Sequence, residues 1–423
     1  MHLPLPKISD IKHKTVLVRV DFNVPLHEDG SVADAQRIQS ALETISFLRE
    51  HEAKIILLTH LGRPDGKYVE KYSLKGVANY LRQHLKLPTH FVHDCIGDEV
   101  RQITQSLAFG EIALLENLRF HPEEEANDVR FAKAIVADAD AEVFINEAFS
   151  ASHRAHASIV GLPSLLPHFA GFSLATEVTM MNKILDKVTR PLVVVLGGAK
   201  IDDKVQAVAN LSKLADIVLV GGGLANTFLK ASGIEVHQSF MGKDEAKNVK
   251  LAKAILDEHH TERTIIQTND DRNGLPLPKI VLPVDVIAAK NSEVTQAEAA
   301  TMPLLKDVKD SSDDLPLQYL DIGPRTTTLF AYLLSTAKTI FWNGPMGVFE
   351  NEPFAKGSRK IAKTIARLSA EKQVISICGG GETSAIINGA GLYNRLTHVS
   401  TGGGATLEFL GGEKLPGIEV LLS

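Results

Sequence analysis

The stretch VVVLGGAK, residues 193–200, passes from four consecutive apolar residues directly into two glycines, an alanine and a lysine. Continuous apolar runs of this length are typical of strands buried on both faces, as in parallel sheets. A helical pattern follows, with apolar residues at Ile201, Val205, Val208 and Leu211. The stretch therefore predicts a strand, a tight turn and an amphipathic helix.

Similar apolar runs recur along the chain between longer amphipathic stretches. They are Thr15–Val20, Ile55–Thr59, Ile112–Leu115, Val143–Asn146, Leu192–Leu196, Ile217–Val220, Thr264–Gln267, Val281–Ala288, Thr339–Trp342 and Val374–Ile377. A further helical pattern has apolar residues at Ile38, Leu42, Ile45 and Leu48. Strands that alternate with helices predict an α/β fold with parallel sheets and right-handed crossovers.

The chain has 423 residues, which corresponds to about two domains. Prolines and glycines interrupt residues 161–171, and a helical pattern follows them. We therefore expect a first domain at 1–172, a connector helix at 173–188 and a second domain at 189–399. Residues 291–316 are polar and contain no apolar run, which predicts a surface excursion within the second domain.

Composition and charge exclude several classes of protein. Lys and Arg number 45 and Asp and Glu 51, for a net charge of −6, and no basic run suggests a surface for nucleic acid or anionic membrane. No segment reaches the ~18 apolar residues of a membrane span. The first residues lack the apolar core of a signal peptide, and the two cysteines, Cys95 and Cys378, suit a reducing compartment. We therefore expect a soluble, cytoplasmic protein.

Glycine clusters follow three of the predicted strands and precede helical patterns. They lie at 197–198, 221–223 and 379–381. Such loops direct backbone N–H groups and the positive end of a helix toward one point, which suits phosphate. One loop could simply be a tight turn, but three of similar design in one domain favour a nucleotide site. The absence of G-x-x-x-x-G-K-[ST] and of G-x-G-x-x-G after a strand disfavours a Walker-type NTPase and a dinucleotide dehydrogenase.

Lys200 and Lys204 lie four residues apart at the start of a predicted helix, so their side chains share one face. Two ammonium groups near the positive end of a helix repel each other unless an anion neutralises them. The spacing therefore indicates an anion site beside Gly198. A solvated surface position remains an alternative for Lys204.

The strand ends of the first half carry basic side chains. His60 and Arg63 follow one predicted strand, and Arg119 and Arg154 follow two others. Arg37 begins a helix, where the dipole disfavours a cation. Because the carboxyl ends of parallel strands share one edge, these groups predict a pocket for a small anion with phosphate or carboxylate groups. A single arginine is more often a surface or ion-paired residue, so the prediction depends on the whole group.

Signals for other chemistries are weak. The nearby histidines His60, His153 and His156 could serve only as hydrogen-bonding groups. No H-E-x-x-H or C-x-x-C motif is present, which disfavours a zinc site, and no G-x-S-x-G motif is present, which disfavours a hydrolase.

Ten segments, taken in order, match the motifs of one known family. They are VDFNVP (20–25), HLGRP (60–64), LLENLRF (114–120), SHRAHAS (152–158), LGGAKIDDK (196–204), GGGLANTFL (221–229), LDIGP (320–324), FWNGPMGVFE (341–350), GGGETS (379–384) and STGGGATLEFL (400–410). On these segments the chain resembles bacterial-type phosphoglycerate kinase over essentially its whole length. The resemblance implies two Rossmann-like domains with parallel sheets, joined by a connector helix, and a C-terminal segment, residues 400–423, that returns to complete the first domain.

The resemblance also implies where ligands bind. 3-Phosphoglycerate would occupy the N-terminal basic pocket, at Asp21, Phe22, Asn23, Arg37, His60, Leu61, Gly62, Arg63, Arg119 and Arg154. MgATP or MgADP would occupy the C-terminal glycine loops, at Gly198, Lys200, Lys204, Gly222, Asn343, Glu350, Gly380, Gly381, Glu382 and Thr383. The residues expected to act in catalysis are Arg37, Lys200, Gly380 and Gly403.

One position departs from the family pattern. The family usually has aspartate after the third glycine of the GGGDT motif, where it helps to hold magnesium, and this chain has Glu382. Magnesium accepts one or two carboxylates together with water and phosphate oxygens, so Glu382 is the expected metal ligand.

The reaction implied by the resemblance is reversible phosphoryl transfer from 1,3-bisphosphoglycerate to MgADP, with hinge closure of the two domains. In the reverse direction the nucleophile is a carboxylate that is already ionised at neutral pH, so no general base is expected. The expected partners are small-molecule substrates, without nucleic acid or membrane, and the family precedent is a monomer. Two alternatives stay open: an NAD-dependent dehydrogenase, and a non-catalytic nucleotide- or phosphometabolite-binding protein of the same fold.

Overall fold

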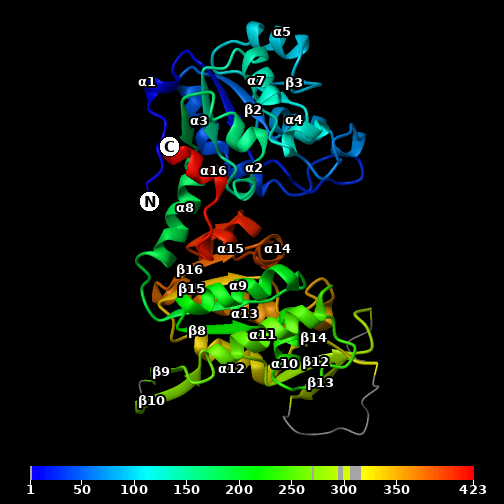
Figure 1. Cartoon of the computed structure of the whole chain (residues 1–423), viewed down its shortest axis with the longest axis vertical. Helices are drawn as coiled ribbons and strands as arrows, with labels where there is room; N and C mark the ends of the chain where they lie inside the picture. Colours follow the sequence, from blue (N-terminus) through cyan, green and yellow to red (C-terminus); the bar gives the residue numbers. More distant parts are fainter. Residues whose placement is uncertain (1, 269–270, 294–298, 305–315) are drawn as a thin grey trace. The chain divides into compact units, whose positions relative to one another are not determined.

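The structure is a computed structural model that describes residues 2–268, 271–293, 299–304 and 316–423. The chain divides into two units (Figure 1). Unit 1 comprises Met1–Thr179 together with Glu413–Ser423, and unit 2 comprises Met180–Gly412. Both ends of the chain therefore belong to unit 1.

Unit 1 alternates strands and helices. Its strands are β1 (Thr15–Arg19), β2 (Lys54–Leu58), β3 (Thr89–Val92), β4 (Ile112–Leu115), β5 (Val143–Asn146) and β6 (His168–Ala170). Its helices are α1 (Ile8–Ile11), α2 (Gln36–Ser40), α3 (Leu42–Glu50), α4 (Lys75–Gln83), α5 (Asp98–Ser106), α6 (Pro122–Glu125), α7 (Val129–Asp138) and α16 (Pro416–Glu419), and α8 (Phe172–Leu185) crosses the division between the units.

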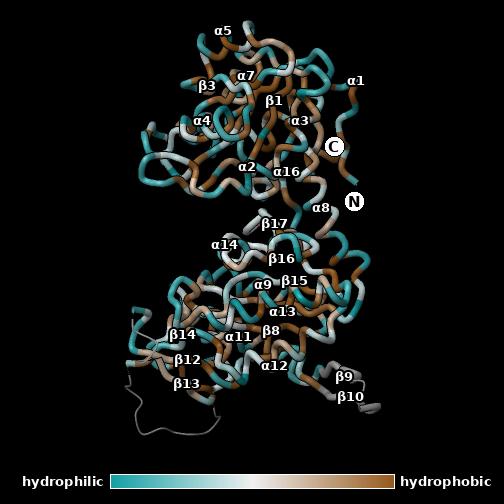
Figure 2. Tube along the Cα trace, turned by 180° about the vertical axis from the view of Figure 1, so that it is seen from behind, coloured by the Kyte–Doolittle hydropathy of each residue, from teal (hydrophilic) through white to brown (hydrophobic). Residues whose placement is uncertain are grey.

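The six strands of unit 1 form one parallel sheet in the order β3-β4-β2-β1-β5-β6. Successive strand residues point to opposite faces. Val16 and Val18 pack in a cluster with apolar residues of α3 and α4, whereas Leu17 packs in a second cluster with residues of α5 and α7. The sheet is therefore a central layer between two layers of helices, and Figure 2 shows its strands as apolar segments.

Unit 2 contains the remaining elements. Its strands are β7 (Leu192–Leu196), β8 (Ile217–Val220), β9 (Arg263–Thr268), β10 (Asp271–Pro278), β11 (Ile280–Val281), β12 (Asp285–Ala289), β13 (Ala300–Pro303), β14 (Gln318–Ile322), β15 (Thr339–Asn343), β16 (Ile375–Gly379) and β17 (His398–Ser400). Its helices are α9 (Ile201–Leu214), α10 (Gly222–Ala231), α11 (Glu245–Glu258), α12 (Pro324–Leu334), α13 (Lys356–Lys372), α14 (Gly381–Gly389) and α15 (Gly404–Leu410).

A second six-stranded parallel sheet organises unit 2, in the order β11-β8-β7-β15-β16-β17. One face packs on α12, α13 and α14 through residues such as Val193 and Trp342, and α9 packs on β7 and β8. The expected α/β fold with two parallel sheets is confirmed. Because the connections run outward in both directions from the β7–β15 pair, the carboxyl ends of these two strands form a topological switch point.

Two of the predicted strands lie wholly or partly outside the parallel sheets. The run Val281–Ala288 was expected to be one strand, but it divides into β11, in the six-stranded sheet, and β12, in a three-stranded antiparallel sheet of order β13-β12-β14. Pro283 lies between them and has no N–H to donate to a ladder. The run Thr264–Gln267 lies in β9, which pairs only with β10 in an antiparallel hairpin.

Other boundaries also differ from expectation. The helical pattern of residues 38–48 forms two helices, α2 and α3, that meet at Ala41. The polar segment 291–316 contains strand β13, while 294–298 and 305–315 lie outside the described residues. The return to unit 1 begins at Glu413 and not at Ser400, because β17 pairs with β16 and α15 contacts α9, both within unit 2.

The start of α8 is held by a buried carboxyl group. Glu147 follows β5, and its side-chain oxygens accept hydrogen bonds from Ser173 N at 3.1 Å and Leu174 N at 3.4 Å. Thr44 Oγ1 donates to the same carboxyl at 2.8 Å and accepts from Phe172 N. Burial raises the pKa of Glu147 to about 8 even though these hydrogen bonds oppose the shift.

Replacing Glu147 with glutamine is expected to flatten the pH dependence of stability. A carboxyl group with a pKa raised from 4.5 to about 8 by folding contributes stability that is fully present below 4.5 and lost as the pH rises through about 8. The urea midpoint of the wild-type chain should therefore fall between about pH 5 and pH 8, and that of Glu147→Gln should fall less. Glu50→Gln, at the exposed end of α3, is the matched control, and its urea midpoint should fall with pH as that of the wild type does. The same fall of the urea midpoint with pH in all three proteins would contradict the prediction.

Candidate active site

The carboxyl ends of β1 and β5 form the switch point of the sheet in unit 1, and predicted site residues gather there. Arg37 of α2 forms an ion pair with Asp21, with Nη1 and Oδ2 2.8 Å apart, and donates to the carbonyl oxygen of Asn23 at 3.3 Å. Ser150, after β5, donates a hydrogen bond to the same Asp21 Oδ2. Arg37 is thus held over this edge by the loop that follows β1.

The loop after β2 is fastened to its neighbours through side-chain amides. Asn23 Oδ1 accepts from Gly62 N at 3.0 Å. The buried side chain of Asn117 accepts from Leu61 N and Arg119 N and donates to the carbonyl oxygens of Leu61 and Tyr72. Asn117 therefore ties the loop containing His60 and Arg63 to the loop containing Arg119.

Three arginines of the predicted group present charge along this edge. Arg119 donates to the carbonyl oxygen of Gly62 at 2.9 Å and pairs with Glu125 at 3.1 Å. Burial, with the charges of Arg154 and Arg63, lowers the pKa of Arg119, although Glu125 opposes the shift. Arg63 and Arg154 are exposed and have no carboxylate partner among the described residues. The cations that the sequence predicted together do lie together.

A buried layer beneath these arginines includes residues that the sequence analysis did not identify. Arg19, at the end of β1, is fully buried and donates to Ser158 Oγ at 2.9 Å, while its Nη2 lies 2.9 Å from His60 Nδ1. Ser158 in turn donates to the buried carboxylate of Glu124 at 2.5 Å. Arg19 stands inside an apolar strand run, and its partners His60 and Ser158 follow 41 and 139 positions later. Only the folded chain reveals this network.

The histidines beside the arginines are neutral at physiological pH. Burial, followed by the charges of Arg19 and Arg119, holds the pKa of His60 well below its usual range. Burial and Arg119 lower the pKa of His156 to about 4. These imidazoles can therefore donate or accept hydrogen bonds, but they do not add positive charge to the pocket.

Two of the predicted substrate-binding residues have side chains in the core. Phe22 is fully buried and Leu61 nearly so, and both pack in the apolar cluster on the α3–α4 face of the sheet. Only their backbone groups are therefore available at the edge. Gly62 has φ +64° and lies against the ring of Tyr72, so a larger residue there would be strained.

In unit 2 the glycine loops come together at the β7–β15 switch point. Gly197 N donates to Asn343 O at 3.0 Å, and Gly222 N donates to Met346 O at 3.0 Å. A Cβ on Gly197 would overlap the carbonyl oxygen of Pro345, and a Cβ on Gly344 would overlap that of Gly197. The predicted sequence of strand, glycine loop and helix is confirmed after β7, β8 and β16.

The two lysines at the start of α9 have different environments. Lys204 is buried, and its Nζ donates to Gly197 O at 2.6 Å. Burial lowers the pKa of Lys204 to about 8, while the nearby carboxylate of Glu382 opposes the shift and Lys200 adds to it. Lys200 is exposed and has no ion-pair partner among the described residues. A solvated position for Lys204, one of the two alternatives, is therefore wrong.

Polar groups around the start of α14 are suited to a Mg-nucleotide. Thr383 Oγ1 accepts from Gly344 N at 2.7 Å, whereas Nδ2 of the buried Asn343 has no hydrogen-bond partner among the described residues. No side chain caps the N-terminus of α14, and the space beside Gly381 is open. Glu382 supplies a carboxylate in the first turn. An unpaired amide, free helix N–H groups and one carboxylate therefore fit phosphate oxygens and a hard cation.

Further predicted residues extend this edge. Gly380 and Gly403 are the N-cap residues of α14 and α15, with φ +96° and φ +57°, and the space beside Gly403 is also open. Gly222, with φ +60°, lies against Gly198. Glu350 is exposed in the loop after β15.

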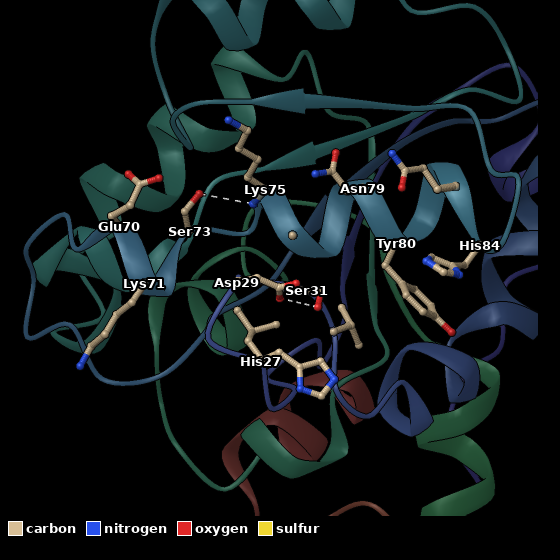
Figure 3. Close-up of a pocket in the computed structure, with 15 residues that line it drawn as sticks. His27, Asp29, Ser31, Glu70, Lys71, Ser73, Lys75, Asn79, Tyr80 and His84 are labelled. Carbon is tan, nitrogen blue, oxygen red and sulfur yellow. Dashed lines mark hydrogen bonds between the residues drawn. The ribbon is translucent and has the colours of Figure 1, made fainter.

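A hollow of about 580 Å³ in unit 1 lies apart from these groups (Figure 3). It is lined by segments 26–32 and 70–84, including Lys75, Tyr80 and His84. None of the predicted site residues lines it. The hollow is therefore not the predicted anion pocket.

Comparisons with known proteins agree with this arrangement. The family model described as phosphoglycerate kinase matches residues 7–413. A phosphoglycerate kinase from Pseudothermotoga lettingae is 44% identical over 412 residues, covering 97% of this chain and 96% of the relative. One from Pelotomaculum thermopropionicum is 42% identical over 415 residues, covering 98% and 97%.

The chain belongs to the phosphoglycerate kinase family. It is therefore a glycolytic kinase, a phosphotransferase. Solved structures of phosphoglycerate kinases agree in fold: that from Pyrococcus horikoshii OT3 has a TM-score of 0.81 and 33% identity, covering 98% of this chain and 97% of the other. That from Coxiella burnetii has a TM-score of 0.77 and 32% identity, covering 99% of both chains. In the described part of this kinase, no helix is both long and apolar enough to span a membrane.

Replacing Asn117 with alanine is expected to destabilise the kinase by roughly 2–4 kcal/mol, because buried backbone groups of Leu61, Tyr72 and Arg119 would lose their partners. Urea unfolding measures this change. Asn394→Ala, at an exposed position of the short helix Tyr393–Arg395, is the control and should stay within about 0.5 kcal/mol of the wild type. A similarly small change in Asn117→Ala would show that the two loops hold their positions without it.

Proposed function

We propose that this kinase transfers a phosphoryl group reversibly between the acyl phosphate of 1,3-bisphosphoglycerate and MgADP, giving 3-phosphoglycerate and MgATP. The observation that carries the proposal is that the two units have different polar groups at the edges of their sheets. In unit 1 arginines lie along the strand edge, and in unit 2 glycine loops, lysines and one carboxylate lie along the corresponding edge. A phosphorylated carboxylic acid suits the first set, and a nucleotide phosphate chain suits the second.

In unit 1, the exposed guanidinium groups of Arg63 and Arg154 would bind the phosphate group of 3-phosphoglycerate, together with Arg119. Their forked donors match phosphate oxygens, and Arg63 and Arg154 have no carboxylate to displace in the described part of the chain. Arg37, whose position is set by Asp21, would orient the carboxylate end and meet the phosphoryl group in transfer. The backbone of Asn23 and Gly62 would complete the pocket.

In unit 2, the first turn of α14 would bind nucleotide phosphate through Gly380, Gly381 and Thr383, and Asn343 would use its unpaired amide. Lys204 would hold its charge near these oxygens, while the exposed Lys200 would contact the phosphoryl group in transfer. Gly198, Gly222 and Gly403 would admit the ligand close to the backbone. Glu382 would hold Mg²⁺, which when bound neutralises charge on the phosphate oxygens.

The proposed chemistry needs no general base. The attacking group in the direction of 1,3-bisphosphoglycerate synthesis is a carboxylate, which has no proton to lose at neutral pH. The lowered pKa values of His60 and His156 agree with a role in hydrogen bonding rather than as cations. Rate enhancement would come from positioning and from positive charge on the transferring group.

Direct transfer requires the two ligands to meet. We include in the proposal a closure of unit 1 and unit 2 over their substrates, which would also exclude water from the acyl phosphate. The connector helix α8 and the segment around Gly402–Gly404 are the candidate hinges. A cytoplasmic location and a monomeric state remain predictions from the sequence.

Arg37→Ala and Lys200→Ala are each expected to lower kcat by about a hundredfold or more, because each removes a positive charge from the transferring group. Coupled turnover with 3-phosphoglycerate and MgATP measures kcat, and thermal unfolding checks the fold. The controls are Arg82→Ala on α4 and Lys213→Ala at the far end of α9, both on exposed helix surfaces. Near-normal kcat in either test variant would remove that residue from its proposed role.

Nucleotide affinity is expected to fall as the pH rises through about 8, the pKa of Lys204. A lysine with a depressed pKa loses its charge above that value, so the Kd for MgADP should rise by up to about tenfold per pH unit there. Equilibrium titration between about pH 7 and pH 9.5 measures this slope. Lys204→Met should bind MgADP more weakly, with a Kd that does not rise with pH in this way. A wild-type Kd that stays constant across the range would refute the role of the Lys204 charge in nucleotide binding.

A further inference from the structure

Three side chains of unit 1 outside the arginine group offer three kinds of metal-ligating atom at one point. Asp94 and Cys95 follow β3, and His121 follows the turn Leu118–Phe120. Their ligand atoms all lie within 4.8 Å of one another, and no other such group of three occurs in the described part of the chain. Carboxylate oxygen, thiolate sulfur and imidazole nitrogen together are ligands that Zn²⁺ accepts.

The separations between these atoms are close to those of a metal site. His121 Nε2 lies 2.6 Å from Asp94 Oδ1, and Cys95 Sγ lies within 4.8 Å of the ligand atoms of both. The thiol at present donates a hydrogen bond to Glu116 O at 2.8 Å. With metal–ligand bonds of about 2.0–2.3 Å in a tetrahedron, ligand atoms lie roughly 3.3–3.7 Å apart. Shifts of about 1 Å in each separation, within reach of side-chain rotation, would convert the existing cluster into such a site.

The surroundings favour a cation at this point. Cys95 is fully buried, and burial, followed by the charges of Asp94, Glu124 and Glu116, raises the pKa of its thiol well above the usual range. Arg19 offsets part of the Glu124 charge. A divalent ion would take the place of the thiol proton, and its charge would balance the carboxylates.

The cluster is also accessible from one side. The side chains of Asp94 and His121 are 49% and 24% exposed, whereas Cys95 closes the inner side. An ion could therefore enter from solvent and keep one water ligand, as zinc sites with three protein ligands do.

We propose that Asp94, Cys95 and His121 bind Zn²⁺ or a similar borderline divalent ion, with water in the fourth position. The ligands come from two separate segments of the chain, so no short zinc motif marks the site in the sequence. The site belongs to unit 1, whereas Glu382, the expected magnesium ligand, belongs to unit 2. Metal binding here is thus separate from the metal requirement of the proposed transfer reaction.

The test is a Co²⁺ titration of the full chain, freed of affinity tag and chelator. About one equivalent of Co²⁺ should bind, with a thiolate-to-cobalt charge-transfer band in the near ultraviolet that Zn²⁺ abolishes by competition. Cys95→Ala should lose the band, and His121→Asn should bind Co²⁺ about tenfold or more weakly.

Two variants serve as matched controls. Cys378→Ala changes the other buried cysteine, which lies in unit 2, and His93→Asn changes a histidine paired with Glu99; both should bind Co²⁺ as the wild type does. Circular dichroism shows whether each variant is folded. If Cys95→Ala does not fold, the Co²⁺ affinity of His121→Asn tests the proposal. The proposal is overturned if the wild type shows no charge-transfer band, or if either ligand variant binds Co²⁺ like the controls.

Discussion

The backbone contact between the loops after β7 and β15 is the constraint on which the proposed nucleotide edge of unit 2 depends. Gly197 and Gly344 approach so closely that a Cβ on either would overlap a carbonyl oxygen of the opposite loop. Lys204, which donates to Gly197 O, lies against Gly344, and Thr383 accepts from Gly344 N, so both α9 and α14 contact this pair of loops. A larger residue at either glycine would separate the loops and, with them, the charged and polar groups of the proposed nucleotide edge.

Unit 1 positions its charges in a different way. Its arginine edge rests on buried polar contacts: Asn117 joins two loops, and Arg19 and Glu124 meet at Ser158 below them. Each buried group has a partner, which offsets the cost of removing it from water. These buried hydrogen bonds do not include the exposed Arg63 and Arg154. Both arginines can therefore remain without carboxylate partners in the described part of the chain.

Local patterns revealed the buried strands and the tight turns after them, and missed features determined by distant partners. The apolar runs of β7 and β8 identified buried parallel strands, and the glycines after them identified the turns into α9 and α10. The run Val281–Ala288 looked similar, but pairing with β8 and with β14 divides it between two sheets. The sequence did not predict the buried hydrogen bonds of Arg19 for the same reason, because a position within a strand does not indicate which residues surround its side chain. The burial of Lys204 depends on the loop containing Gly344, which no spacing in α9 could show.

The division of the chain has a consequence for its synthesis. Unit 1 receives its last piece from Glu413–Ser423, where Gly417 N donates to Ser152 O and Gly417 O accepts from Asn146. All of Met180–Gly412 leaves the ribosome before that piece does. Although most of unit 1 is translated first, it cannot be completed until Glu413–Ser423 has been made, so the inserted unit 2 is the first that can fold as a whole.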